Sequence, residues 1–326
     1  MTRYTDCDFN EKTVLVTGGA GFIGSNLVFH LQNHYPQCKI VVFDAFALGH
    51  FKNLRGFRGQ CVAGDIACRE DLQKLERYRF DHVFHQAAIS DTTVSDQQRM
   101  IRVNTDSFRD LLRLESVRQA SVVYASSAGV YGNSAPPHRV GQGETPENIY
   151  GFSKLMLDQA AAEIALCHPA PIIGLRYFNV YGPRESYKGS TASMALQLGR
   201  TLLREETPKL FKYGEQKRDF VFIEDVIQAN MKAAAASQSG VYNVGGGKAR
   251  SYNDLLKALC VCLHCSAEPE YIDNPWGFFQ NHTQADIAET RRKLDYEPQY
   301  SLEEGLRAYA PEIRRLAERA EKLRAA

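Results

Sequence analysis

Three glycines at a fixed spacing, Gly18, Gly21 and Gly24, constrain this chain more than any other feature of its sequence. They separate a short β-branched run, residues 13–17, from a helical pattern over residues 22–34. In such a strand–turn–helix unit the first glycine allows a tight turn, and the second lets the backbone approach a pyrophosphate. The third lets the helix pack closely on the strand. The pattern therefore predicts a dinucleotide-binding turn at the start of the first helix.

Further residues that such a nucleotide site needs follow at the ends of the next predicted strands. Asp44 ends the second strand, about 20 residues beyond the glycines, where a carboxylate binds a ribose hydroxyl. Asp65 follows the third strand, where it would cap the adenine side. The fourth strand ends in Gln86, Ala87 and Ala88. Because small residues at the edge of a parallel sheet leave room for a ligand, we expect all five to line the nucleotide site.

Short apolar runs alternate with helical patterns through the first half of the chain, including one expected helix over residues 103–117. This alternation predicts an α/β fold: a Rossmann-type, doubly wound parallel sheet with helices on both faces. We expect this domain over residues 1–176, joined by part of 220–247. Residues 177–191 are dense in Gly, Pro, Tyr and charge and are expected to form a loop. Residues 177–326 should form a smaller, mixed, substrate-binding C-terminal lobe.

Composition and charge narrow the class of protein. The 326 residues carry 39 Lys and Arg against 38 Asp and Glu, a formal charge of +1, which does not suit non-specific nucleic-acid binding. No apolar run reaches the roughly 20 residues that span a bilayer. The acidic segment before residue 13 does not resemble a signal peptide. We therefore expect a cytoplasmic protein with no membrane and no nucleic-acid partner.

The 8 cysteines are expected to be reduced thiols in that compartment. Cys260, Cys262 and Cys265 cluster around His264, which suggests a zinc site. However, positions two apart do not share a helix face, and no second cysteine pair completes a tetrahedral set. We interpret the three cysteines as small apolar residues of a helix over residues 255–263, and we predict no metal site.

A tyrosine and a lysine are placed for acid/base chemistry. Tyr150 and Lys154 are four residues apart in a helical pattern over residues 149–166, so they share one helix face. A phenol with a pKa of about 10 is a poor base near neutral pH, but a nearby ammonium and a cationic ring both favour the phenolate. A tyrosine becomes a general acid/base in this way. Ser127 ends the fifth predicted strand and could bind the same substrate oxygen.

The motifs TGGAGFIGS, YASSAGVYG and YGFSK, in this order, resemble those of the extended short-chain dehydrogenase/reductase family over essentially the whole chain. Members of this family include nucleotide-sugar epimerases, dehydratases and reductases. The resemblance implies a bound nicotinamide cofactor that contacts a set of residues drawn from all of these motifs. The set is Gly18, Gly21, Phe22, Ile23, Gly24, Asp44, Lys52, Asp65, Ile66, Gln86, Ala87, Ala88, Ser90, Asn104, Tyr150, Lys154, Val180 and Lys188.

The sugar chemistry is narrowed by the remaining motifs. Sugar 4,6-dehydratases typically carry an Asp-Glu pair after the strand-end hydroxyl, whereas this chain has Ala128 and Gly129. Residues 176–190 and 278–286 resemble the ADP-glyceromanno-heptose 6-epimerases. In that family the lysine of the Arg-Glu-x-x-Lys-Gly-Ser stretch, here Lys188, is a second acid/base. A plain phosphate contact is the alternative role for Lys188.

The same resemblance implies an ADP-sugar substrate and a homo-oligomer, such as a pentameric ring. It places the substrate against Ser127, Asn179, Ser190, Gln197, Phe211, Arg218 and Phe279. The planar guanidinium of Arg218 suits a pyrophosphate, and Gln197 stands where relatives often have His. The implied reaction interconverts two ADP-heptoses, epimeric at C6, through a 6-keto intermediate, for lipopolysaccharide core synthesis.

Two observations about the cofactor oppose each other. Asp44 by itself favours a free 2′-hydroxyl and hence NAD. The resemblance favours NADP, and Lys52 and Arg55 could reach a 2′-phosphate. We expect NADP, with NAD as the alternative.

Two other functions stay open on the sequence alone. UDP-galactose 4-epimerases share the Ser-Ala-x-Val-Tyr-Gly pattern, so a UDP-sugar 4-epimerase or a related reductase is the first alternative. A non-catalytic NAD(P)-binding sensor on the same fold is the second. The sensor is disfavoured because Ser127, Tyr150, Lys154 and Lys188 are all present, and a sensor has no use for them.

Overall fold

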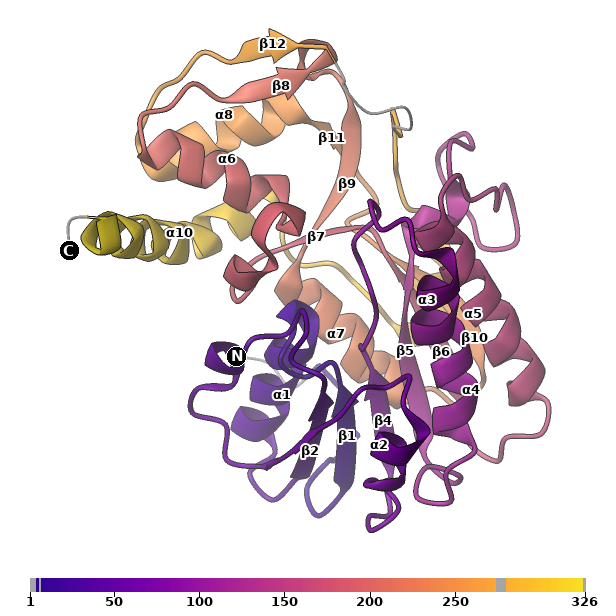
Figure 1. The fold of residues 1–326 in the computed structure, drawn as a ribbon. Coiled ribbons are helices and arrows are strands. Elements are labelled where there is room, and N and C mark those ends of the chain that lie inside the picture. Colours follow the sequence, from indigo (N-terminus) through magenta and orange to yellow (C-terminus); the bar gives the residue numbers. More distant parts are fainter. Residues whose placement is uncertain (1–3, 6, 274–279, 325–326) are drawn as a thin grey trace.

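The computed structural model describes residues 4–5, 7–273 and 280–324. Its larger body is a seven-stranded parallel sheet in the order β10-β6-β5-β4-β1-β2-β3 (Figure 1). The strand order changes direction between β1 and β4, which confirms the doubly wound α/β fold. The strands are β1 (Thr13–Thr17), β2 (Lys39–Asp44), β3 (Gln60–Ala63), β4 (His82–His85), β5 (Ser121–Ser127), β6 (Ile172–Tyr177) and β10 (Gly240–Val244).

Both faces of this sheet are buried, because successive side chains of a strand point to opposite layers. Val14 and Val16 of β1 pack in one core, and Leu15 between them packs in the other. The first layer contains α1 (Phe22–His34) and α7 (Ile223–Ala234); the second contains α2 (Arg69–Gln73), α4 (Ser107–Leu112) and α5 (Ile149–Ala165). This two-sided burial explains the continuous apolar runs of the sequence.

The single helix expected over residues 103–117 is wrong in extent and regularity. The chain forms α3 (Gln97–Ile101), a π-helical turn (Arg102–Asp106) and then α4. Within the π turn, Asn104 accepts the Ile89 N–H at 2.8 Å and donates to the Ile89 carbonyl at 3.0 Å. The hydroxyl of Thr105 donates to a carbonyl of α5, that of Ser153, at 2.9 Å. These hydrogen bonds to distant segments stabilise the π turn, which inserts an extra residue into the helix.

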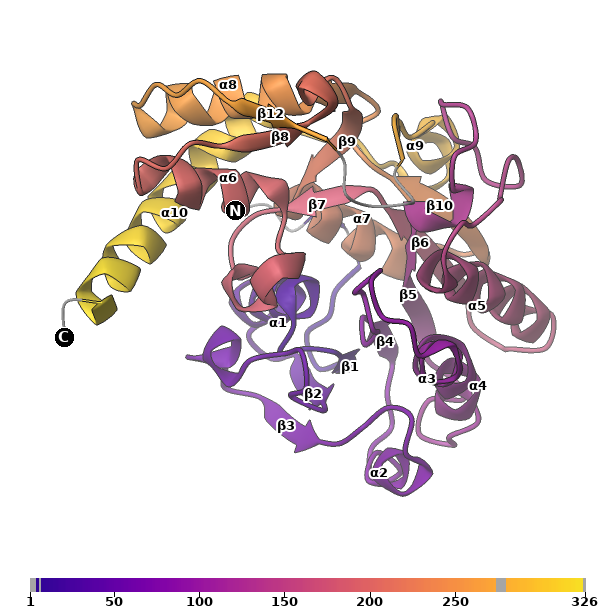
Figure 2. The same cartoon turned by 45° about the horizontal axis from the view of Figure 1, so that its top comes forward.

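The smaller C-terminal lobe holds two small sheets and a group of helices (Figure 2). The sheets are β11-β9-β7 and β12-β8. Their strands are β7 (Asn179–Tyr181), β8 (Lys209–Phe211), β9 (Lys217–Phe222), β11 (Ala249–Ser251) and β12 (Glu270–Ile272), and the helices are α6 (Met194–Leu203), α8 (Tyr252–Leu263) and α10 (Leu302–Arg324). The remaining helix, α9 (Ala288–Leu294), contacts β10 and α7 of the larger body. Figure 2 shows α6, α8 and α10 packed together. One hydrophobic core continues from the α1 and α7 layer into this lobe.

The loop expected over residues 177–191 is also corrected. It contains β7 and a 3₁₀ turn, Ser186–Thr191. β7 is only three residues long and exists because it pairs in parallel with β9, where Val180 lies opposite Val221. The chain then returns to the large sheet, since α7 packs on α1 and β10 forms the edge strand beside β6. The two bodies are thus joined by several crossings of the chain.

Candidate active site

A cavity of about 1120 Å³ lies at the carboxyl edge of the parallel strands and reaches into the C-terminal lobe. This is where ligands bind in doubly wound folds. Most of the residues singled out from the sequence line it. These are Gly18, Gly21, Phe22, Ile23, Gly24, Asp44, Asp65, Ile66, Gln86, Ala87, Ala88, Ser90, Ser127, Tyr150, Lys154, Asn179, Val180, Lys188 and Ser190.

The glycine turn has the shape that a dinucleotide requires. Gly18 has a φ of +66°, and a Cβ there would lie 2.7 Å from the backbone nitrogen of Ala87. A Cβ on Gly24 would overlap the carbonyl oxygen of Gly18. Near Gly21 only the Gly18 carbonyl oxygen lies within reach, at 3.1 Å, so its remaining space opens toward the cavity. A side chain at Gly18 or Gly24 would therefore displace the backbone of the turn, and one at Gly21 would enter the cavity.

Asp44 is held at the end of β2 by the same turn. Its carboxylate accepts the N–H of Ala20 at 2.8 Å and the N–H of Phe46 at 2.7 Å. Burial raises the pKa of Asp44, and the two backbone hydrogen bonds oppose that rise. A carboxylate has about four acceptor sites, so lone pairs remain for a ribose hydroxyl. These residues fit the adenosine half of NAD(P).

Tyr150, Ser127 and Lys154 meet where β5 and α5 come together. Asn148 begins α5 by accepting the N–H of Gly151 at 2.8 Å, which fixes the first turn that carries Tyr150. Burial raises the pKa of the Tyr150 phenol, and its hydrogen bond with Ser127 lowers it. The Lys154 ammonium donates to the Ala125 carbonyl on β5 at 2.8 Å. The helix and the strand thus hold all three groups at one wall of the cavity.

Lys154 is only 2% exposed, and burial lowers its pKa to about 8. Asp158, one helical turn further on, opposes this shift because its negative charge favours the ammonium. Asp158 is itself fixed by hydrogen bonds from Tyr124 at 3.0 Å, Ser126 at 3.0 Å and Arg176 at 2.8 Å. A buried acidic group therefore supports the lysine from behind the cavity wall.

Lys188 approaches the same cavity from the C-terminal lobe. Its ammonium lies 5.7 Å from the centre of the Phe22 ring, in the first turn of α1. Burial lowers the pKa of Lys188, and the charge of Glu185 raises it. The Glu185 carboxylate accepts hydrogen bonds from the N–H of Gly182 at 3.2 Å and from Ser193, at 2.6 Å for the N–H and 2.7 Å for the hydroxyl. It thereby closes the turn that carries Lys188.

Some predicted contact residues do not line the cavity. Asn104 is fully buried and holds Ile89, which does line it. Gln197 donates to the carbonyls of Ser190 and Ala192, at 3.1 and 2.7 Å, and so shapes the wall from behind.

The other predicted contact residues are spread more widely. Lys52 is exposed, beyond the Asp44 loop. Arg218 lies with its guanidinium 5.7 Å from the ring of Tyr252, a lining residue. Phe211 ends β8, away from the cavity lining. Phe279 lies outside the described residues.

The cavity also has walls that sequence reasoning missed. They include Leu48, Gly49, Arg99, Tyr187, Met194, Phe220 and Tyr252. The positions of Tyr187 and Leu48, next to Lys188 and shortly after Asp44, were the available signals. Phe220 and Tyr252 carried none, because β9 and the start of α8 reach the cavity only through the pairing of β9 with β7 and β11.

The part of the chain described here shows no cluster of three or more His, Cys, Asp or Glu side chains suited to a metal ion. Cys260, Cys262 and Cys265 are free and partly buried, and they pack against the large hydrophobic core. Within the described ranges, no helix has both the length and the apolar character needed to cross a membrane.

Residues 14–245 match the NAD dependent epimerase/dehydratase family, and the chain belongs to that family. Over nearly its whole length it is similar to the ADP-L-glycero-D-manno-heptose-6-epimerase of Helicobacter pylori. The identity is 51%, with 96% of this chain and 99% of that chain covered and a TM-score of 0.91.

More distant relatives share the fold and the family. The UDP-glucose 4-epimerase of Thermotoga maritima, solved with UDP-glucose, is 29% identical, with 93% and 99% covered and a TM-score of 0.84. A UDP-glucuronic acid 4-epimerase variant of Bacillus cereus, solved with NAD and a fluorinated UDP-sugar, is 29% identical over the same shares, with a TM-score of 0.82.

Proposed function

We propose that this protein is a nucleotide-sugar epimerase that interconverts ADP-D-glycero-D-manno-heptose and ADP-L-glycero-D-manno-heptose. The reaction passes through a 6-keto intermediate and serves lipopolysaccharide core heptose synthesis. The observation that carries the proposal is that Tyr150 and Lys188 line one cavity from different parts of the fold. The similarity to the Helicobacter pylori enzyme supports the choice of sugar.

The residues at the cavity fit a nicotinamide dinucleotide. The glycine turn would hold the pyrophosphate, Asp44 the adenosine ribose, and Tyr150 and Lys154 the nicotinamide side. When bound, NAD(P) supplies the hydride acceptor and donor that a transient oxidation of a carbinol needs. Ala87 and Ala88 leave the sheet edge free of bulky side chains.

The protein's own groups handle the protons. Tyr150 exchanges a proton with the sugar hydroxyl on one side of the reacting carbon, while Ser127 and Lys154 support the phenolate. Because the epimer is formed on the opposite face, a second proton group is needed there. Lys188 takes that role, since it lines the cavity from the C-terminal lobe and burial lowers its pKa below the usual value of a lysine. Asn179 and Ser190 line the cavity and are the proposed sugar contacts. Arg218 is the proposed partner of the pyrophosphate of the ADP-sugar.

The test of this function is to incubate the purified protein with ADP-, UDP- and GDP-sugars and to follow the stereochemistry by NMR. Inversion at C6 of an ADP-heptose is the expected result. Inversion at C4 of a UDP-sugar would support the alternative activity instead, and the Thermotoga maritima neighbour is the reason to include that arm. Binding without any conversion would favour a nucleotide sensor.

The preferred cofactor is proposed to be NADP, with NAD as the alternative outcome. Asp44 favours NAD, whereas the resemblance and the nearby Lys52 favour NADP. We predict that denaturing the purified protein releases mainly NADP(H), identified by chromatography. Release of mainly NAD(H) would show that Asp44 decides the preference. A cytoplasmic location and a ring-shaped homo-oligomer, such as a pentamer, belong to the same proposal, and sedimentation analysis tests the latter.

A further inference from the structure

The segment after Asp44 and the segment before Lys188 are tied to each other by a reciprocal pair of hydrogen bonds. The side-chain amide of Asn53 donates to the carbonyl of Arg184 at 3.1 Å. The guanidinium of Arg184 donates back to the carbonyl of Asn53 at 2.6 Å. Asn53 is only 5% exposed, so water does not compete freely for these bonds.

Asn53 also reaches the glycine turn. Its amide donates to the carbonyl of Ala20 at 3.1 Å, and the same carbonyl accepts the N–H of His50 at 3.0 Å. The N–H of Ala20 donates to Asp44 at 2.8 Å. Ala20 of the glycine turn therefore connects, through its N–H, to the acid that would bind ribose and, through its carbonyl, to the residue that holds Arg184.

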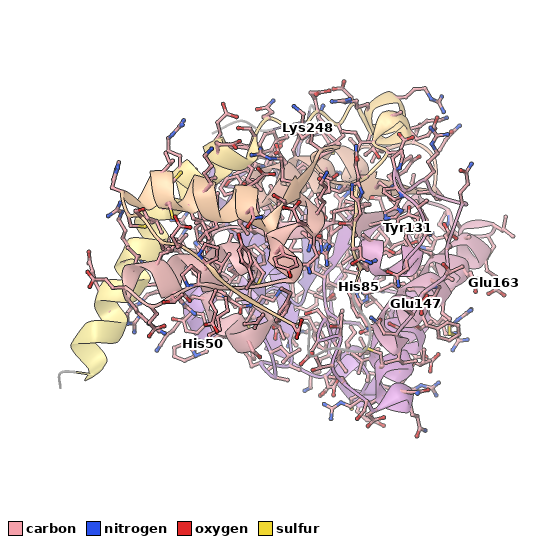
Figure 3. All side chains as sticks on the ribbon, turned by 90° about the horizontal axis from the view of Figure 1, so that it is seen from above. His50, His85, Tyr131, Glu147, Glu163 and Lys248 are labelled. Carbon is pink, nitrogen blue, oxygen red and sulfur yellow. The ribbon has the colours of Figure 1, made fainter. Side chains whose placement is uncertain are left out.

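An outer contact joins the same two segments. The ring of His50 stacks on the ring of Tyr187, with centroids 4.0 Å apart and an interplanar angle of 16°. The ammonium of Lys52 lies 6.0 Å from the centre of the Tyr187 ring. Figure 3 shows His50 at the rim of the molecule, whereas His85 lies in its interior. Tyr187 precedes Lys188 and lines the cavity, so this stack borders the proposed proton site.

Arg184 has a strained backbone conformation and is held by contacts with three other segments. Its φ of +74° is unusual for a residue other than glycine. The guanidinium lies 4.0 Å from the centre of the Phe29 ring on α1, and the backbone N–H donates to Glu312 of α10 at 3.0 Å. Such a conformation persists only where its surroundings fix it, and Asn53 supplies two of the fixing contacts.

We infer that Asn53 is a positioning residue that couples cofactor binding at the glycine turn and Asp44 to the placement of Lys188. The inference rests on the proposed function for the role of Lys188. A dinucleotide in the cavity touches the glycine turn and Asp44, and Asn53 links both to Arg184, four residues before Lys188. Binding there would help to hold the 182–193 segment in place through this link, in addition to direct contact with the residues of that segment that line the cavity, and loss of the link would weaken that hold.

Hydrogen–deuterium exchange of the 182–193 segment, with and without added NADP or NAD, tests the coupling without any sugar substrate. The cofactor should slow exchange there in the wild-type protein, and Asn53→Ala should lose most of this protection. Gln32→Ala is the matched control. Gln32 tethers the far end of the same loop, through Gly56 at 3.1 Å and Arg58 at 2.7 Å, and does not touch Arg184. It should keep the protection.

Retained protection in Asn53→Ala, or equal loss in both variants, would overturn the inference. If Asn53→Ala does not fold, His50→Ala decides in its place, because it removes the stack on Tyr187, together with the ring's contacts to Phe51 and to the N–H of Lys52, and should weaken the protection. Unchanged protection in His50→Ala would then count against the coupling.

A second measurement separates placement from fold stability. With the ADP-heptose, Asn53→Ala should lower the rate of epimerisation about 10²-fold, the effect of a misplacement near 1 Å, while the first half-reaction still forms reduced cofactor at the wild-type rate. Equal losses in both steps would mark a general structural defect and overturn the inference. If the wild-type protein converts no ADP-heptose, the proposed function fails, and the exchange experiment still judges the coupling by itself.

Discussion

The two lysines of the cavity are held in different ways. Lys154 lies on α5, a 17-residue helix, and donates to the adjoining strand β5. Lys188 lies on a 3₁₀ turn of 6 residues. Each has a buried carboxylate nearby in the chain, Asp158 after Lys154 and Glu185 before Lys188.

The difference shows which parts of the site depend on regular structure. Asp158 on α5 is hydrogen-bonded to Arg176 on β6. The part of the helix that carries Lys154 is therefore held against the sheet. Glu185 bonds Gly182 and Ser193 within its own segment, and Arg184 ties that segment to Asn53 and Glu312, so the placement of Lys188 depends on a few side-chain contacts and not on regular structure. The lysine on α5 is thus fixed by regular structure, and the lysine on the 3₁₀ turn by side-chain contacts of its loop.

Replacing Tyr150, which lies on α5, should have the largest effect on the rate of epimerisation. Tyr150→Phe removes the acid/base hydroxyl, and we expect epimerisation to fall by roughly 10²–10⁴. Because the ring remains, cofactor content should stay near normal. Turnover is measured by NMR and cofactor content by chromatography. A variant that turns over at the wild-type rate would remove Tyr150 from the mechanism.

Replacing Lys188, which lies on the 3₁₀ turn, should affect catalysis and not the binding of the substrate. Lys188→Met is expected to abolish epimerisation, a loss of at least about 10²-fold, while ADP-sugar binding stays largely intact. Calorimetry gives Kd, and the rate at saturating substrate gives kcat. A phosphate-contact role predicts the reverse, since losing a charge-assisted hydrogen bond costs about 1.5–3 kcal/mol of affinity. Weakened binding with near-normal kcat would contradict the second acid/base.

The smallest effect is expected from the carboxylate that closes the turn. The negative charge of Glu185 favours the ammonium form of Lys188 and so raises its pKa. In Glu185→Gln that support is lost, so the pKa of Lys188 should fall. The limb of the pH–rate profile that belongs to Lys188 should then move to lower pH. The same limb of the pH–rate profile in the Tyr150→Phe variant serves as a reference. If the limb does not move in Glu185→Gln, then Glu185 does not influence the pKa of Lys188.

The parts of the site that the sequence predicts are those whose geometry is local. The glycine spacing sets the turn, and the four-residue spacing of Tyr150 and Lys154 sets one helix face, because both lie within a single element. The apolar runs predicted the parallel sheet for the same reason. Asp44 could be placed because it ends a strand next to that turn.

The parts that could not be predicted depend on contacts between distant segments. β7 is too short, at 3 residues, to be recognised before it pairs with β9. Asn53 and Arg184 are 131 positions apart in sequence, and nothing in either neighbourhood points to the other. Asn104 was predicted as a cofactor contact from the resemblance. Its place behind the wall depends on a π turn that the apolar pattern does not encode.

The turn Ser186–Thr191 and the residues after it line the same cavity as the glycine turn. A dinucleotide bound there would be in reach of both segments. An epimerase has no net demand for oxidant, so each molecule can work through many cycles with the nucleotide it first captured. The rate in a growing cell would then depend on the oxidised fraction of the nicotinamide cofactor at the time when it binds. Later changes in the cellular redox balance would not affect the enzyme.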